Sequence, residues 1–125
     1  MAGKTKILII EDEEMLSTMY KVKFENEGYE VFTAPNGAEG LELAKKHAPQ
    51  IILLDIIMPK IDGFAVLKKL KDDVLTKAIP VILMWSSFMQ LDDQLFKDSM
   101  ADASLEKPFD TETIRELVEK LVPKL

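Results

Sequence analysis

Three short stretches of this chain consist of apolar residues with no polar residue between them. They are Ile7–Ile10, Ile51–Leu54 and Val81–Met84. An unbroken apolar run of this length is typical of a strand that is buried on both faces, as strands of a parallel sheet are. Two further strands are predicted at Glu30–Ala34, which alternates, and at Ala103–Glu106, chiefly because of its spacing.

Apolar residues with helical spacing fill the gaps between these strands. They predict five helices, marked by Leu16, Met19, Tyr20 and Phe24; by Ala38, Leu41 and Ala44; by Phe64, Leu67 and Leu70; by Leu91 and Leu95; and by Ile114, Leu117, Val118 and Leu121. Gly28 and Pro49 are expected to end the first two helices, and Asp110 or Thr111 to cap the last. Such alternation predicts an α/β protein with a parallel sheet and helices on both faces.

The composition narrows the classes of function. A chain of 125 residues suits one domain, and we expect a single domain over residues 1–125 with no output domain. The net charge of −6 argues against direct binding of nucleic acid or of an anionic membrane. Cysteine is absent from the sequence, and no apolar segment approaches membrane-spanning length, so we expect a cytoplasmic protein without membrane insertion.

Charged residues follow three of the predicted strands. Glu11 and Asp12 come directly after the first strand, Asp55 after the third and Lys107 after the fifth. In open α/β sheets, ligands bind beyond the carboxyl ends of the strands, so these side chains are expected at one edge. Glu11 and Asp12 could instead cap the first helix, Asp55 could be a turn residue, and Lys107 could be a surface lysine.

Three neighbouring carboxylates repel one another unless a cation or protons intervene. A hard divalent cation with oxygen ligands removes this repulsion, and Mg²⁺ is the usual choice beside phosphate. A lysine nearby supplies a positive charge for a second anion. Together these groups predict a phosphoryl-transfer site. The sequence contains no GxGxxG or GxxxxGK[ST] loop, so nucleotide binding through such a loop is not expected.

Four motifs carry a resemblance to a known family across nearly the whole chain. They are IIEDE at Ile9–Glu13, LLDIIMPKIDG at Leu53–Gly63, PVILM at Pro80–Met84 and ADASLEKPF at Ala101–Phe109. In order and spacing they resemble a response-regulator receiver domain, the phosphoacceptor module of two-component signalling, similar to the chemotaxis regulators. The resemblance implies a flavodoxin-like (βα)5 fold with strand order 2-1-3-4-5, which is also a worked example of the doubly wound class.

The resemblance also implies a role for each charged residue. Asp55 would be the nucleophile that takes a phosphoryl group from a histidine kinase or phosphotransfer protein. Glu11 and Asp12 would hold Mg²⁺ together with Asp55 and the backbone carbonyl of Ile57, and Lys107 would pair with a phosphoryl oxygen. The protein would be a signalling phosphoacceptor rather than an enzyme. It would contact a downstream protein through its fourth helix, fifth strand and fifth helix.

The chain departs from the family pattern at the residues that usually couple phosphorylation to the switch. Relatives place Thr or Ser five residues after the proline of the fourth strand, and counting from Pro80 gives Trp85. Either Trp85 replaces the hydroxyl, or a bulge brings Ser86 into its place. Ser104 stands where relatives often carry Tyr or Phe. We predict that Trp85 packs toward the gap above Ser104 or covers the mouth of the site.

Two other functions compete with this interpretation. The first is a receiver-like docking domain that has lost or weakened its phosphorylation switch, which Trp85 and Ser104 favour and the acids oppose. The second is an enzyme that carries phosphate on Asp55, as aspartate-nucleophile phosphatases do. Those enzymes usually have a second aspartate two residues further on, where this chain has Ile57.

Overall fold

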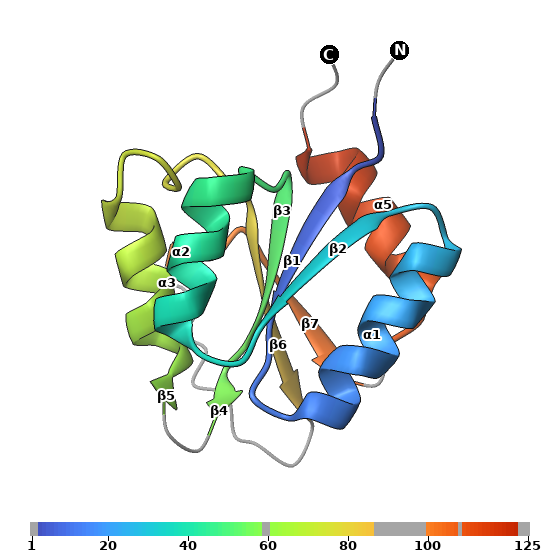
Figure 1. The fold of residues 1–125 in the computed structure, drawn as a ribbon, viewed down its shortest axis with the longest axis horizontal. Helices are drawn as coiled ribbons and strands as arrows, with labels where there is room; N and C mark the ends of the chain where they lie inside the picture. Colours follow the sequence, from blue (N-terminus) through green and yellow to red (C-terminus); the bar gives the residue numbers. More distant parts are fainter. Residues whose placement is uncertain (1–2, 59–60, 87–99, 108, 123–125) are drawn as a thin grey trace.

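The computed structural model of this protein describes residues 3–58, 61–86, 100–107 and 109–122. Its main sheet has five parallel strands in the order β2-β1-β3-β6-β7 (Figure 1). These strands are β1 (Lys6–Ile10), β2 (Glu30–Ala34), β3 (Ile51–Asp55), β6 (Val81–Ser86) and β7 (Ala103–Lys107). The predicted strand order is therefore confirmed, with β6 and β7 as the fourth and fifth strands.

Helices cover both faces of the sheet. The described ranges contain α1 (Glu14–Asn26), α2 (Gly37–His47), α3 (Gly63–Asp72) and α5 (Thr111–Leu121). Figure 1 shows α2 and α3 on one face of the sheet and α1 and α5 on the other. The helix predicted around Leu91 and Leu95 lies outside the described residues. None of the helices in the described ranges is long and apolar enough to span a lipid bilayer.

Each face of the sheet has its own hydrophobic cluster, and β1 contributes to both. Leu8 and Ile10 belong to the cluster under α2 and α3, whereas Ile7 and Ile9 belong to the cluster under α1 and α5. All four side chains are completely buried. Burying a side chain of this size contributes about 1.5–3 kcal/mol relative to leaving it exposed. The run contains no polar residue because neither face of the strand meets water.

The helix ends follow the predicted signals. Gly28 follows α1 with a φ of 99°, a left-handed conformation that glycine adopts without steric cost. Asp110 is the N-cap of α5, and its Oδ1 accepts a hydrogen bond from the Thr113 N–H at 2.9 Å. Asp110 therefore caps the last helix, and Thr111 is the first residue inside it.

One residue of the predicted buried stripe on α1 is exposed. Tyr20 and Phe24 are buried and Leu16 packs against the same cluster, but Met19 is 47% exposed. At about 100° per residue, Met19 and Phe24 stand roughly 140° apart around the helix axis. The sheet covers the flank of α1 that carries Phe24, so Met19 faces outward beside Met15, which is 80% exposed.

Three strands extend further toward their carboxyl ends than predicted. β3 includes Asp55, β6 includes Trp85 and Ser86, and β7 includes Lys107. Asp55 pairs in register with Met84, and the β6–β7 ladder continues to the end of both strands. Asp55, Trp85 and Lys107 therefore sit on hydrogen-bonded strand ends rather than on loops, which fixes their backbone positions.

A small hairpin was not predicted. β4 (Ile57–Met58) and β5 (Ile61–Asp62) pair antiparallel just beyond β3 and lead into α3. Two residues per strand are too few for a period of alternation to be recognised in the sequence. The hairpin lies at the same end of the sheet as the carboxyl ends of the strands (Figure 1).

Candidate functional site

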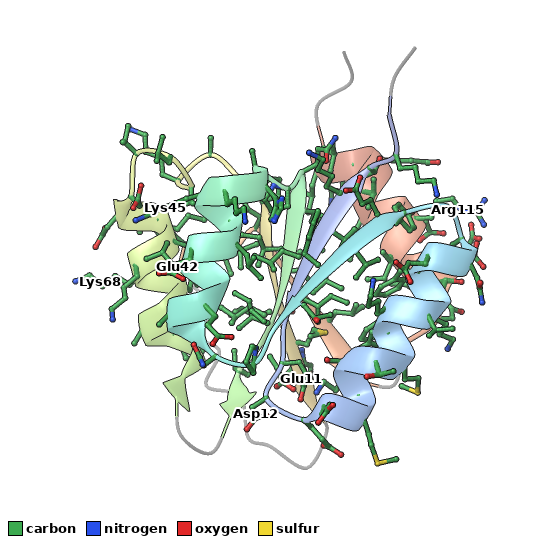
Figure 2. All side chains as sticks on the ribbon, viewed as in Figure 1. Glu11, Asp12, Glu42, Lys45, Lys68 and Arg115 are labelled. Carbon is green, nitrogen blue, oxygen red and sulfur yellow. The ribbon has the colours of Figure 1, made fainter. Side chains whose placement is uncertain are left out.

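Three charged side chains from distant parts of the chain meet at the carboxyl ends of the strands. Asp55 is the last residue of the central strand β3, Lys107 is the last residue of β7, and Glu11 follows β1. Figure 2 shows Glu11 and Asp12 at this end of the sheet. Glu11 is 3% exposed and Asp55 is 1% exposed, so two carboxyl groups are buried side by side. Carboxyl groups are almost never fully buried unless they are paired.

Lys107 links the two buried acids. Its Nζ donates a short hydrogen bond to Asp55 Oδ2 and lies 3.5 Å from Glu11 Oε2. The N–H of Glu13 donates to Glu11 Oε1 at 3.2 Å. Among the described residues, Glu11 Oε2 has no hydrogen-bond partner, although it is buried. One lysine therefore serves two acids, and one carboxyl oxygen is left incompletely satisfied.

The pKa shifts at the site reflect the same shortage of positive charge beside two buried acids. Burial, together with the neighbouring Asp55 carboxylate, raises the pKa of Glu11 to about 8, and the Lys107 ammonium only partly opposes this. Burial works against the charged form of Lys107, but the Asp55 and Glu11 carboxylates outweigh it, and the net effect raises the lysine pKa. Near neutral pH a proton on Glu11 relieves the repulsion that one ammonium cannot neutralise.

Asp12 lies beside these residues but is exposed. The N-cap position of α1 is occupied by Glu13, which makes no side-chain capping hydrogen bond. The prediction that Glu11 or Asp12 could cap the first helix is therefore wrong. Because Glu11 turns inward to Lys107, it is a member of the charged cluster, and the first helix begins after both acids.

The donor chemistry of the site fits a hard cation. Glu11 and Asp55 supply carboxylate oxygens, one of them without a hydrogen-bond partner in the described part of the chain, and Asp12 offers another at the edge. The described residues nevertheless contain no ready-made group of three metal-ligating side chains. Asp12 points outward, and the Lys107 ammonium already occupies Asp55 Oδ2. The donors are present, but in the described part of the chain they do not converge on one point.

The residues predicted at the switch positions, Trp85 and Ser104, lie on the neighbouring strands β6 and β7. The β6–β7 register runs continuously from Ile82 opposite Ala103 to Ser86 opposite Lys107. The bulge that would have moved Ser86 into the place of Trp85 is therefore absent from this ladder. Trp85 packs against the cluster under α2 and α3.

The indole of Trp85 is also incompletely satisfied. Its Nε1 is buried without a hydrogen-bond partner in the described ranges. Ser104 pairs with Leu83, whose side chain belongs to the same cluster as Trp85, so Ser104 and Trp85 share one face of the sheet. Ser104 is exposed. The shared face is what the predicted packing of Trp85 toward Ser104 requires, and the contact itself stays a prediction.

Tyr20 is a neighbour of the site that the sequence indicated only as a core residue. It is buried on α1, and burial raises its pKa, while the Lys107 ammonium lowers it and the Glu11 and Asp55 carboxylates raise it further. Its ring stacks on Phe109, two residues after Lys107. The helical spacing of Tyr20 predicted burial, but nothing in the sequence indicated which loop it would meet.

A five-stranded parallel α/β sheet with buried acids and a lysine at its carboxyl edge defines the class of receiver-like phosphoacceptor folds. The sequence of residues 7–119 matches the family model of the response regulator receiver domain, and the chain belongs to that family. It is therefore homologous to the phosphoacceptor domains of two-component response regulators.

Curated relatives include both short and long proteins. The DNA-binding dual master transcriptional regulator RpaA of Synechocystis is 40% identical over 118 residues, covering 94% of this chain and 48% of that protein. The sporulation initiation phosphotransferase F of Bacillus subtilis is 37% identical over 119 residues, covering 94% of each. The chain thus spans about half of the first relative and nearly all of the second.

Solved structures show the same fold. Chemotaxis protein CheY4 of Vibrio cholerae has a TM-score of 0.84 and 27% identity, covering 96% of this chain and 100% of that one. The receiver domain of sensor histidine kinase PA1611 from Pseudomonas aeruginosa has a TM-score of 0.83 and 22% identity, covering 96% of this chain and 98% of that one. The latter structure contains a magnesium ion coordinated in its active-site cleft.

Proposed function

We propose that this receiver domain accepts a phosphoryl group on Asp55 and passes the signal on through protein contacts. The observation that carries the proposal is the position of Asp55. Its buried carboxylate ends the central strand, contacts Lys107 and lies beside Glu11. A histidine kinase or a phosphotransfer protein would supply the phosphoryl group, as receiver domains interact with such partners.

The chemistry requires one nucleophile and one leaving group. A carboxylate oxygen of Asp55 forms a bond to phosphorus as the phosphorus–nitrogen bond of the donor's phosphohistidine breaks. The electron pair of that bond returns to the imidazole nitrogen, and the product is an acyl phosphate on Asp55. The rigid strand end holds the nucleophile in place. Lys107 is close enough to Asp55 for its ammonium to leave the carboxylate and pair with a phosphoryl oxygen.

Mg²⁺ is the cofactor that this donor set suits. Glu11, Asp12, Asp55 and the backbone carbonyl of Ile57, the first residue of β4, would hold it. When bound, it would neutralise negative charge on the phosphoryl oxygens. The Glu11 Oε2 atom, which is buried without a hydrogen-bond partner among the described residues, supports this assignment, as does the magnesium in the receiver of PA1611. Asp12, which is exposed, would complete the set by turning inward.

The output is proposed to be a protein contact rather than direct binding of nucleic acid. The net charge of −6 disfavours a nucleic-acid surface on this chain, although RpaA as a whole binds DNA. The contact surface would comprise the segment around Leu91 and Leu95, together with β7 and α5. A cytoplasmic setting agrees with a sequence that lacks cysteine.

Phosphorylation by a small donor tests the proposal directly. Incubation with acetyl phosphate and Mg²⁺ should add the mass of one phosphoryl group, and Asp55→Asn should add none. Asp73→Asn, in the loop after α3, is a matched control that should behave as wild type. A phosphoryl group on the Asp55→Asn protein, or none on wild type, would show that Asp55 is not the acceptor.

A second candidate function is a docking domain whose switch is weakened, and Trp85 favours it. An indole has one N–H donor and no acceptor, so it cannot replace a small hydroxyl that moves toward a phosphoryl oxygen. Asp55 would then be phosphorylated with little conformational response. Amide NMR with beryllofluoride and Mg²⁺ should show smaller shifts across β7 in wild type than in Trp85→Thr. Equal shifts in the two proteins would exclude a weakened switch.

A further inference from the structure

A row of three aromatic rings joins α1 to the segment that follows Lys107. The rings of Phe24 and Tyr20 stack with centroids 6.2 Å apart, and those of Tyr20 and Phe109 stack with centroids 5.4 Å apart at 13°. Phe24 is completely buried and Tyr20 is 7% exposed. The row therefore starts deep in the cluster under α1 and α5 and ends two residues beyond Lys107.

Among the described residues, the backbone of Lys107 is paired with a neighbouring strand on one side only. Lys107 is the last residue of β7, an edge strand that pairs only with β6 in the described sheet. After it, the chain is anchored at Phe109 by the ring stack and at Asp110 by the N-cap of α5. The cap fixes where the helix begins, whereas the stack fixes the chain against α1.

We infer that the ring of Tyr20 is a positioning element for Lys107, acting through its stack on Phe109 and setting how well the ammonium meets a phosphoryl group on Asp55. The inference rests on the proposed phosphoacceptor function. Tyr20 touches neither the donor nor the phosphoryl group, so it is not a catalytic residue. Its role is to hold the segment after Lys107. The Lys107 side chain can then move between Asp55 and a phosphoryl oxygen while its backbone stays in place.

The ring rather than the hydroxyl carries this role. The stack is a contact between ring faces, and phenylalanine makes the same contact. Tyr20→Phe should therefore behave as wild type, and Tyr20→Leu should not. Phe24→Leu is the matched control, because it removes a buried ring from the same row but leaves the Tyr20–Phe109 contact in place.

The experiment compares the affinity for an anion with the affinity for the metal alone. Beryllofluoride at saturating Mg²⁺ reports the contact with Lys107, whereas Mg²⁺ alone reports the carboxylates. The fluorescence of Trp85, the only tryptophan in the sequence, follows both titrations. Tyr20→Leu should weaken beryllofluoride binding about three- to tenfold, the range to which aromatic pair energies convert. Its affinity for Mg²⁺ should be no weaker than that of wild type.

The other variants complete the test. Phe109→Leu should weaken beryllofluoride binding as Tyr20→Leu does, and the double variant should be no weaker than either, since both break one contact. Phe109→Leu also serves if Tyr20→Leu does not fold. Equal effects of Tyr20→Leu and Phe24→Leu, a parallel fall in Mg²⁺ affinity, or a defect in Tyr20→Phe would each overturn the inference. If wild type fails to bind beryllofluoride, the proposed function is at fault instead.

Discussion

Two largely buried lysines lie at opposite ends of the sheet, and they have different surroundings. Near the amino ends of the strands, Lys71 donates to Ile79 O at 2.9 Å, Lys77 O at 3.4 Å and Asp102 Oδ2 at 2.9 Å. An ammonium has three donors, and all three are used. At the carboxyl ends, Lys107 meets the carboxyl groups of two buried acids.

The difference separates a structural cluster from the candidate functional one. Asp102 Oδ2 also accepts the Val81 N–H at 2.8 Å, so the Lys71 cluster ties α3 to the start of β6 and of β7 with its charges balanced. In the Lys107 cluster, two acids share one cation, and Glu11 Oε2 has no hydrogen-bond partner among the described residues. A site that is incompletely satisfied can gain free energy from a metal or a proton, and a satisfied one cannot.

The largest expected effect is the loss of the balanced cluster. Lys71→Met should lower the free energy of unfolding by about 2–3 kcal/mol, because the Asp102 carboxylate and two carbonyls lose their donor. The midpoint of urea unfolding should fall with an unchanged slope. Lys45→Met is the control, since it breaks a more exposed pair with Asp73 and should cost less than about 1 kcal/mol. If the two variants lose the same free energy of unfolding, Lys71 stabilises the fold no more than an exposed lysine does.

The second prediction is that the free energy of unfolding depends on pH because of Glu11, at the carboxyl ends of the strands. In metal-free buffer with a chelator, Glu11 has a pKa of about 8 in the folded protein, against 4.5 as its ordinary value. The folded state therefore binds the proton more tightly, and this contribution to stability is lost as the pH rises from about 4.5 to about 8. We expect a fall on the order of 1–3 kcal/mol between pH 5 and pH 8.5. In Glu11→Gln, the plot of stability against pH should be flatter. If the wild-type plot is equally flat, Glu11 is not the source of the pH dependence.

The third prediction is that replacing a carboxylate with an amide stabilises the protein at the carboxyl ends of the strands and destabilises it at the amino ends. At pH 8.5 without metal, Glu11→Gln should stabilise the fold by about 1 kcal/mol, because it removes a buried charge that lacks a full partner. Asp102→Asn should destabilise it by about 1–2 kcal/mol, because its carboxylate accepts hydrogen bonds from the Lys71 ammonium and from the Val81 N–H. Chemical denaturation of both variants measures the two signs. If both changes destabilise the protein, the two clusters are not different in kind.

The last prediction is that Mg²⁺ stabilises the folded protein. At a concentration about ten times its Kd, a ligand that binds only the folded state adds about 1.4 kcal/mol. Thermal unfolding with and without Mg²⁺ should show this shift for wild type and for Asp102→Asn, whose substitution lies at the other end of the sheet. Asp12→Ala should lose most of the shift. If Asp12→Ala keeps it in full, Asp12 is not a ligand.

Most of the architecture could be predicted because burial on two faces leaves a local signature. The runs at Ile7–Ile10 and Ile51–Leu54 proved to be interior strands with residues in both hydrophobic clusters. The signal was weaker where only part of a surface is covered. Met19 fits the helical spacing but lies outside the arc of α1 that the sheet covers. The hairpin of Ile57–Met58 with Ile61–Asp62 left no pattern at all, because its strands are too short for one.

The residue types at the ends of the strands could be read without a structure. Glu11, Asp12, Asp55 and Lys107 could be assigned to one edge of the sheet because parallel strands all end on the same side. The distribution of these charges depends on how the elements pack. It buries Glu11 and leaves Asp12 exposed, and it brings Lys107 onto Asp55 across 52 positions of sequence. It also stacks Tyr20 on the segment after Lys107. Such contacts depend on how α1 and β7 pack against the sheet, and no local pattern of residues records that packing.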